Sequence, residues 1–376
     1  MTSLKSPITP LLGNEVFAVG DTSVQLVIRD VDPRADSVSA SVDGKRSQIA
    51  LRDGVGIGEL SGLAPDAEFA IELLNDRGDV IEELTGRTRP RIEPTARIAT
   101  ISDVHLGAEG FGPTGRPEYT GATPYPLLTG QGAIAEALAW GAQALVIKGD
   151  LTDTGSSEEW QMAAELLEGV DIPVLITAGN HDVWGTRDVL PDVGAASIGR
   201  AVHDVEILDL PGVRIVLADT SIPGHGSGDL ARLNDQLVQA VDTPEPILLC
   251  LHHHIQRAPM PWFWPPGIPR ANATPVLERL TNVNPSIMAT SGHSHRNRVH
   301  GLLDGRLTVT EVSASSDYPG VWAGYEIGNG LLRQTVRRIA APDALAWTES
   351  TRKAIGGVWG RWSQGRLEER CVDVQF

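Results

Sequence analysis

The pattern of apolar and polar positions divides the chain near residue 93. Before this point, apolar and polar residues alternate in short segments, such as 37–51 around Asp43-Gly44 and 69–84 around Asn75 to Gly78. Alternation with a period of two predicts half-buried strands, and an Asp-Gly pair between two such runs predicts a hairpin. No helical period occurs here, so residues 1–93 are expected to form a small all-β sandwich. The proline-containing, charged segment 87–96 is expected to be a linker.

After residue 94 the pattern changes to short, continuous apolar runs separated by helix-like segments. The runs are those at 97–102, 144–149, 173–178, 214–219, 246–251 and 286–292. The helix-like segments are those at 132–142, 156–169 and 228–241, and hairpins are expected over 298–315 and 320–339. Alternation of buried strands and helices predicts α/β layers, with ligand sites beyond the carboxyl ends of the strands. We expect a catalytic domain over 94–340 and a C-terminal extension, 341–376, with a helix near 342–354, packed on it.

Composition narrows the classes of partner. The net charge of −17 and the pI near 5.0 argue against a nucleic-acid polymer as partner, because such binding rests on lysine and arginine at phosphates. The two cysteines are too few for a disulfide framework, and neither a signal-peptide core nor a membrane-spanning apolar run is present. We therefore expect a cytoplasmic protein without a membrane partner, and a homo-oligomer stays open. In an acidic protein, metal ions are the obvious source of positive charge for handling phosphate esters.

Polar residues that can bind metal follow five of the buried runs. They are Asp103 and His105; Asp150; Asn180, His181 and Asp182; His252, His253 and His254; and His293 and His295. Glycines precede three of these groups, where the chain must turn sharply off a strand. Carboxylate, imidazole and carboxamide ligands together suit Mn, Fe or Zn. About seven ligands are too many for one ion and fit two ions that share one carboxylate.

The ordered set ATISDVHLG, VIKGDLTD, ITAGNHDVW, LLCLHHH and ATSGHSH resembles the signature of calcineurin-like metallophosphoesterases over residues 97–340. The resemblance implies a four-layer α/β/β/α sandwich around two divalent or trivalent metal ions. One ion would take Asp103, His105, Asp150 and His295. The other would take Asp150, Asn180, His252 and His293, so that Asp150 bridges the pair. His252 is preferred within the triple histidine because it directly follows the strand, and His253 is the alternative.

The same resemblance implies the catalytic groups. His181 would contact the phosphate or the leaving oxygen together with Asn180, and the neighbouring Asp182 could orient its imidazole. His253 is a further candidate for substrate contact. Asp153 stands where purple acid phosphatases carry a ligating tyrosine, which argues against that branch.

Two further segments carry resemblances that bear on domain type and substrate. LAPDAEFAIEL (63–73) resembles the fibronectin type III pattern, with Phe69 in place of the usual tyrosine. Residues 217–241 resemble the bacterial cyclic-nucleotide and glycerophosphodiester branch of the metallophosphoesterases. This implies a phosphodiesterase for small-molecule phosphate esters, acting by attack of a metal-bound hydroxide. A phosphomonoesterase or nucleotide pyrophosphatase with the same centre is the alternative, and a non-catalytic scaffold is disfavoured because no ligand is missing.

Two loops are expected to shape the pocket. Residues 107–131 follow the first ligand pair and are long enough to act as a lid. Residues 255–270 follow the triple histidine and carry Trp262, Phe263 and Trp264 between prolines. We expect Trp262 and Trp264 to contact the substrate, because aromatic rings can stack on a nucleobase or enclose an organic leaving group. Packing of these rings against another domain or subunit is the equal alternative.

Overall fold

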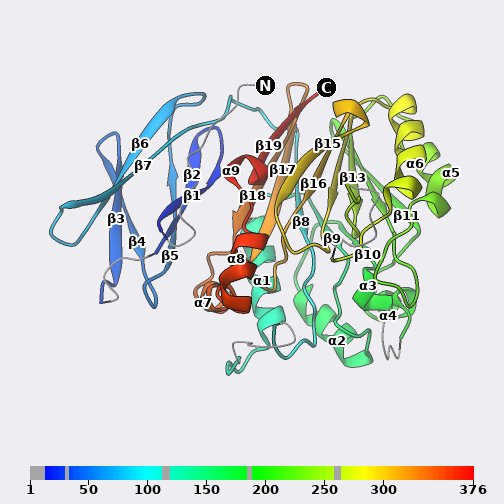
Figure 1. Ribbon diagram of the computed structural model, residues 1–376, viewed down its shortest axis with the longest axis horizontal. Coiled ribbons are helices and arrows are strands. Elements are labelled where there is room, and N and C mark those ends of the chain that lie inside the picture. Colours follow the sequence, from blue (N-terminus) through cyan, green and yellow to red (C-terminus); the bar gives the residue numbers. More distant parts are fainter. Residues whose placement is uncertain (1–12, 30–33, 112–118, 184–188, 258–263) are drawn as a thin grey trace.

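The computed structural model describes residues 13–29, 34–111, 119–183, 189–257 and 264–376. Its first part consists of two small antiparallel sheets, which lie beside the larger α/β body (Figure 1). One sheet has the order β1 (Glu15–Val19), β2 (Ser23–Ile28), β5 (Gly56–Ser61). The other has the order β4 (Lys45–Ala50), β3 (Ser37–Val42), β6 (Glu68–Leu74), β7 (Val80–Arg87). The two sheets enclose a shared apolar core, and the predicted hairpins are β3–β4 and β6–β7.

The α/β body contains two six-stranded sheets. The first has the order β10 (Val174–Thr177), β9 (Ala144–Lys148), β8 (Ala96–Ile101), β17 (Val321–Gly328), β18 (Leu331–Arg338), β19 (Cys371–Gln375). The second has the order β11 (Val205–Leu210), β12 (Val213–Ala218), β13 (Ile247–Leu251), β14 (Ile287–Ser291), β16 (Leu307–Glu311), β15 (Arg298–Leu302). Strands β8, β9 and β10 are mutually parallel, as are β12, β13 and β14. Parallel strands bring their carboxyl ends to one edge of each sheet.

The layering is the predicted α/β/β/α arrangement. Residues of both sheets, such as Val146 on β9 and Leu248 on β13, form one apolar core between them. Helices α1 (Tyr125–Ala139), α2 (Ser157–Leu166) and α4 (Pro191–Ser197) pack on the outer face of the first sheet. Helices α5 (Asn234–Ala240) and α6 (Arg270–Val283) cover the outer face of the second. Both predicted late hairpins are present, as β15–β16 and β17–β18.

Several elements differ from the sequence-based expectation. Strand β11 and helices α4 and α6 were not predicted. Helix α6 buries Ala273, Val276, Leu277 and Leu280, a helical stripe that its polar composition and internal Pro275 obscure in the sequence. The helix expected over 228–241 starts later, with a 3₁₀ turn at Ala231–Leu233 followed by α5.

The C-terminal extension is built into the body. It contains α7 (Pro342–Thr351), a 3₁₀ turn η3 (Ala354–Gly357), α8 (Val358–Ser363), α9 (Leu367–Arg370) and β19. Strand β19 pairs with β18 and forms an edge of the first sheet. Its helices lie between the N-terminal sheets and the body (Figure 1), where Arg370 Nε donates to the carbonyl oxygen of Phe17 at 2.9 Å. The extension therefore touches both parts of the molecule, and the boundaries at 93 and 340 stay a prediction.

Buried polar contacts also join the N-terminal sheets to the body directly. The Gln25 side chain donates to the Arg338 carbonyl at 3.0 Å and accepts from the Arg338 N–H at 2.8 Å. The buried Arg29 guanidinium donates to Glu15 and Glu349, each at 2.8 Å. Among the described residues, no helix has both the length and the apolar character needed to span a membrane.

Candidate metal centre

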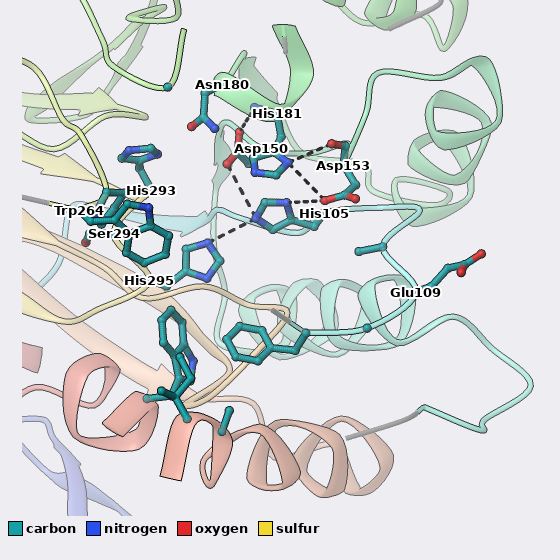
Figure 2. A pocket seen from close by; sticks show the side chains of 18 of the residues that line it. His105, Glu109, Asp150, Asp153, Asn180, His181, Trp264, His293, Ser294 and His295 are labelled. Carbon is teal, nitrogen blue, oxygen red and sulfur yellow. Dashed lines mark hydrogen bonds and ion pairs between the residues drawn. The ribbon is translucent and has the colours of Figure 1, made fainter. Parts of the chain in front are cut away.

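The predicted ligands meet where the carboxyl ends of the two sheets approach each other. Asp103 and Asp150 follow β8 and β9 of the first sheet, whereas His252 and His293 follow β13 and β14 of the second. Two hydrogen bonds cross between the sheets at this edge. His252 Nδ1 lies 2.8 Å from the Lys148 carbonyl oxygen, and the His293 N–H donates to Asp103 at 3.0 Å. The structure thus brings the ligands of both sheets to one site (Figure 2).

A first cluster consists of Asp103, His105 and His295, whose candidate ligand atoms lie within 4.8 Å of one another. His295 Nε2 is 3.3 Å from Asp103 Oδ1 and 3.4 Å from His105 Nε2. His105 Nε2 is also 3.8 Å from Asp150 Oδ2. Asp150 therefore borders this cluster, and Figure 2 shows His105 between Asp150 and His295.

A second cluster meets Asp150 at the same carboxylate oxygen, Oδ2. His252 Nε2 is 3.4 Å from Asp150 Oδ2 and 3.1 Å from Asn180 Oδ1. Since His252 Nδ1 faces the Lys148 carbonyl, its Nε2 is left for the carboxylate side. Asp103, Asp150 and His252 also form a group whose ligand atoms lie within 4.8 Å. Both carboxylates thus stand between the histidines of the two sheets.

Within the triple histidine, these contacts place His252 beside Asp150 and Asn180, and its choice as the ligand stays a prediction. His253 is fully buried, and its Nδ1 lies 2.9 Å from Thr220 Oγ1. It joins His252 and His293 in a further cluster, and, like His252, it is not among the described residues that line the cavity. The predicted substrate contact of His253 is therefore not supported by its position, whereas its place beside His293 keeps it near the centre.

The surrounding charges keep the carboxyl groups of Asp103 and Asp150 in their anionic form. Burial raises the pKa of Asp103, but His295 and His252 outweigh burial and hold the pKa well below its ordinary value. The same balance, chiefly through His252 and His181, holds the pKa of Asp150 low. Burial, together with neighbouring histidines, lowers the pKa of His293 to about 3, so that its imidazole is neutral. Anionic carboxylates and a neutral imidazole are the protonation states that metal binding requires.

Unfavourable backbone conformations concentrate at this site. Five of the seven predicted ligands have positive φ angles, a region that residues other than glycine seldom adopt. The angles are 55° at Asp103, 54° at His105, 48° at Asp150, 65° at His293 and 48° at His295. Each such residue costs on the order of 1–3 kcal/mol, and such strain gathers at functional sites where the surrounding structure enforces it.

Two of the glycines that precede the ligands have different roles. Gly149 has a φ of 81°, which fits the predicted sharp turn off the strand. Gly179, in contrast, has no left-handed φ. A Cβ there would lie 2.2 Å from Asp150 Oδ1, so glycine is needed to let the carboxylate approach.

The orientation of His181 differs from the expectation. His181 Nδ1 lies 3.0 Å from the Asp153 carbonyl oxygen and 3.3 Å from Asp153 Oδ1. The carboxylate of Asp182 instead accepts hydrogen bonds from the N–H groups of Thr152 at 2.8 Å and Gly179 at 2.7 Å. Asp153, rather than Asp182, therefore holds the imidazole of His181, and the prediction for Asp182 is corrected. Asp182 instead ties together the loops that carry Asp150 and Asn180.

Asp153 also contacts the candidate metal ligand His105. Its Oδ1 is 3.2 Å from His105 Nδ1, so one carboxylate orients both His105 and His181 (Figure 2). Burial raises the pKa of Asp153, but the hydrogen bonds from these two histidines hold it well below its ordinary value. The sequence placed Asp153 near the site without revealing this role.

Asp317 is a functional residue that the sequence analysis missed. Its Oδ2 is 2.6 Å from His295 Nδ1, which fixes the ring so that Nε2 faces Asp103. The other oxygen accepts from Trp359 Nε1 at 3.1 Å. A carboxylate that accepts a hydrogen bond from the other ring nitrogen of a metal-binding histidine sets the tautomer and orientation of that ring. The only signal in the sequence was a polar stretch, 313–317, between two hairpins.

A cavity of about 810 Å³ opens beside these clusters. The candidate ligands His105, Asp150, Asn180, His293 and His295 line it, together with His181. Residues 108–111 of the expected lid also line it, residues 112–118 lie outside the described residues, and α1 begins at Tyr125, before the expected end of the lid. Trp264 lines the cavity with 72% of its surface exposed, whereas Trp262 and Phe263 lie outside the described residues.

The residues at the site fit a pair of metal ions. Two buried carboxylates, one carboxamide oxygen and several imidazole nitrogens lie close together here. The donor set lacks thiolates, since both cysteines lie elsewhere in the described structure, and this set suits Mn, Fe or Zn.

Two solved structures show limited similarity to the chain, at low sequence identity. A dimetal phosphatase from Danio rerio superposes with a TM-score of 0.49 at 15% identity, covering 65% of this chain and 97% of that one. A purple acid phosphatase from yellow lupin seeds gives a TM-score of 0.45 at 14% identity, covering 89% of this chain and 73% of that one.

Curated relatives match part of the chain. A probable cyclic nucleotide phosphodiesterase of Rhodococcus erythropolis is 31% identical over 175 residues, which cover 43% of this chain and 52% of the relative. A glycerophosphodiester phosphodiesterase of Enterobacter lignolyticus is 30% identical over 122 residues, covering 29% of this chain and 41% of the relative. The matches thus span about half or less of these relatives. The family model of calcineurin-like phosphoesterases matches residues 96–297, more than half of the chain. Together with the ordered metal-binding motifs, this match shows that the chain belongs to the calcineurin-like phosphoesterase family.

Proposed function

We propose that this protein is a phosphoesterase with two metal ions that hydrolyses small phosphodiesters, such as cyclic nucleotides or glycerophosphodiesters. The observation that carries the proposal is the convergence of candidate ligands from both sheets around Asp103 and Asp150, beside a cavity that several of them line. The names of the curated relatives support a diester as substrate. The lining of the cavity leaves room for an organic group beside the ligands.

The contacts support a division of the ligands between two positions. Asp103, His105 and His295, with Asp150 at their border, would hold one Mn, Fe or Zn ion. Asn180, His252 and His293 would hold the second, and Asp150 would be shared with the first. When bound, such a pair activates water near neutral pH and neutralises the charge that develops on a phosphoryl group.

His181 is placed to act on the substrate. Its side chain lines the cavity and is 38% exposed, while Asp153 holds the ring through Nδ1. Burial lowers the pKa of His181, but Asp150 and Asp153 outweigh burial and raise it to about 10. A protonated imidazole in this position can stabilise a phosphoryl oxygen and donate a proton to the leaving oxygen. Asp153 acts as a positioning residue for this ring.

The first experiment tests the bridging carboxylate. Purified protein loaded with Mn²⁺ is assayed on bis-p-nitrophenyl phosphate and p-nitrophenyl phosphate, alongside Asp150→Ala and the exposed control Asp235→Ala. Asp150→Ala should lose activity and bound metal while its circular dichroism stays native, and Asp235→Ala should match the wild type. Wild-type turnover after removal of metal would overturn the proposal. Faster hydrolysis of the monoester would favour a phosphomonoesterase instead.

A second variant separates catalysis from metal binding. His181→Ala should lower kcat by roughly 10²–10⁴-fold, as expected for loss of an acid-base group. Its metal content, measured by atomic emission, should stay at the wild-type value. Loss of one metal equivalent would instead identify His181 as a ligand.

The rest of the proposal concerns the parts of the chain outside the catalytic body and the location of the enzyme in the cell. We propose that the N-terminal sheets and the C-terminal extension support the catalytic body and supply no acid-base group. A reducing, cytoplasmic location is supported by the two cysteines, Cys250 and Cys371, which are unpaired in the structure.

A further inference from the structure

One wall of the cavity is apolar and comes from the C-terminal extension. Ala354, Ile355 and Trp359 line the cavity together with Phe111 from the loop after β8. The rings of Phe111 and Trp359 have centroids 4.8 Å apart, and both belong to a small apolar cluster around Ala354. The Trp359 ring is 5.8 Å from that of His295. The wall therefore starts directly beside a candidate metal ligand.

Ile355 is unusual within this wall. Its side chain is 59% exposed, and its backbone has a φ of 53°. A left-handed conformation is a clear outlier for a β-branched residue, and exposed apolar surface brings no stabilisation. Two glycines, Gly356 and Gly357, follow in the same left-handed region. Strain of this kind is typical of ligand clamps, and an apolar group bound in the cavity would cover the side chain.

The charges around the cavity restrict what can lie on this wall. Among the described lining residues there is no lysine or arginine, and the acidic side chains are Glu109, Asp150 and Asp153. An additional anionic group on this wall would therefore find no lysine or arginine as a counter-charge. Glu109 belongs to the loop on the His105 side (Figure 2), and the wall itself consists of uncharged side chains.

We propose that this wall binds an uncharged, apolar alkyl or aryl group esterified to the phosphate, and that Ile355 determines this preference. The inference rests on the proposed phosphodiesterase function and names the class of organic group that the site accepts. Three of the four wall residues lie beyond residue 297, where the family match ends. The preference is thus a property of the C-terminal extension of this chain.

Three glycerol phosphate diesters test the proposal, with hexanol, methanol or choline as the second alcohol, followed by ³¹P NMR on Mn²⁺-loaded protein. The wild type should have a kcat/KM for the hexyl ester at least about tenfold above that for the methyl ester, because several methylenes leave water. Ile355→Gly should lower this ratio by about five- to tenfold. Because glycine tolerates the left-handed backbone, its Tm should not fall, which excludes unfolding as the cause. The control is Val358→Ala, since Val358 is also 55% exposed but is not among the lining residues, and its ratio should be unchanged.

Several results would overturn the inference. A wild-type ratio near one, or an unchanged ratio in Ile355→Gly, would show that the wall does not select apolar groups. Preference for the choline ester would show that the aromatic rings select a cation instead. If no diester is hydrolysed, the affinities of the Mn²⁺-loaded protein for hexyl phosphate and methyl phosphate are measured by calorimetry. In that case the proposed function fails, and tighter binding of hexyl phosphate still supports the wall, whereas equal binding rejects it.

Discussion

Replacement of Arg29 by methionine should destabilise the whole molecule, because Arg29 lies at the junction between the N-terminal sheets and the body. Its side chain is 2% exposed and donates to Glu15 and Glu349, each at 2.8 Å, and to the Tyr318 hydroxyl at 3.2 Å. Glu349 lies on α7 of the C-terminal extension, and Tyr318 follows Asp317, which holds a candidate metal ligand. One guanidinium therefore connects three parts of the chain.

The expected magnitude follows from the groups that remain. Removing one partner of a buried ion pair costs about 3–5 kcal/mol when the other charge is left unpaired. In Arg29→Met, Glu15 keeps Arg370 at 3.3 Å and Glu349 keeps Arg338 at 2.5 Å. The carboxylates thus stay paired, and the loss should lie near the lower end, about 3 kcal/mol. With an unfolding entropy of about 2 cal/mol/K per residue over the chain, this corresponds to a fall in Tm of about 4 °C.

Differential scanning calorimetry of the wild type and two variants measures this effect. The matched control is Arg279→Met, which removes a surface pair with Asp235 at 3.3 Å, where the side chains are 54% and 83% exposed. Such a pair contributes about 0–1 kcal/mol, so the Tm of the control should change by about 1 °C or less. An Arg29→Met variant whose Tm matches that of Arg279→Met would refute the role of the buried network.

Three further predictions concern pH, metal affinity and the turn at the centre. Burial raises the pKa of Glu349, but the neighbouring arginines outweigh burial and hold it well below 4.5. The contribution of Glu349 to stability is therefore complete above pH 4.5 and declines as the pH falls. The Tm should drop from pH 4.5 to pH 3, and it should drop less steeply in Glu349→Gln. Asp317→Asn should weaken Mn²⁺ binding by about 10–100-fold in a calorimetric titration, and unchanged affinity would exclude a role in positioning the ligand that it contacts. Gly149→Ala should lower Tm and metal content, because a Cβ would lie 2.6 Å from His252 Nδ1. The control is Gly169→Ala, at a glycine that is also left-handed but faces open space. Its free energy of unfolding should fall only by the cost of the left-handed backbone, about 1–2 kcal/mol.

Local patterns were enough to predict most of the strands and the residues that gather at their carboxyl ends. Buried runs and turn residues act within a few positions, so the strands preceding Asp103, Asp150 and His252 could be assigned without knowledge of their neighbours. Parallel strands then bring such residues to one edge by topology alone. Helix α6 escaped prediction because its buried stripe is embedded in a polar sequence with an internal proline.

The sequence by itself therefore determined the layered fold and the identity of the metal-binding motifs, since both depend on residue type and spacing along one strand. Only the tertiary structure decided which groups orient the histidines of the site. Asp153, instead of Asp182, holds His181, and Asp317 holds His295 from a loop that follows a later strand. The C-terminal wall around Trp359 reaches the site from more than sixty positions beyond the last ligand. Such contacts depend on how distant segments pack, and no local period along the chain encodes the packing of two segments that meet only in the folded state.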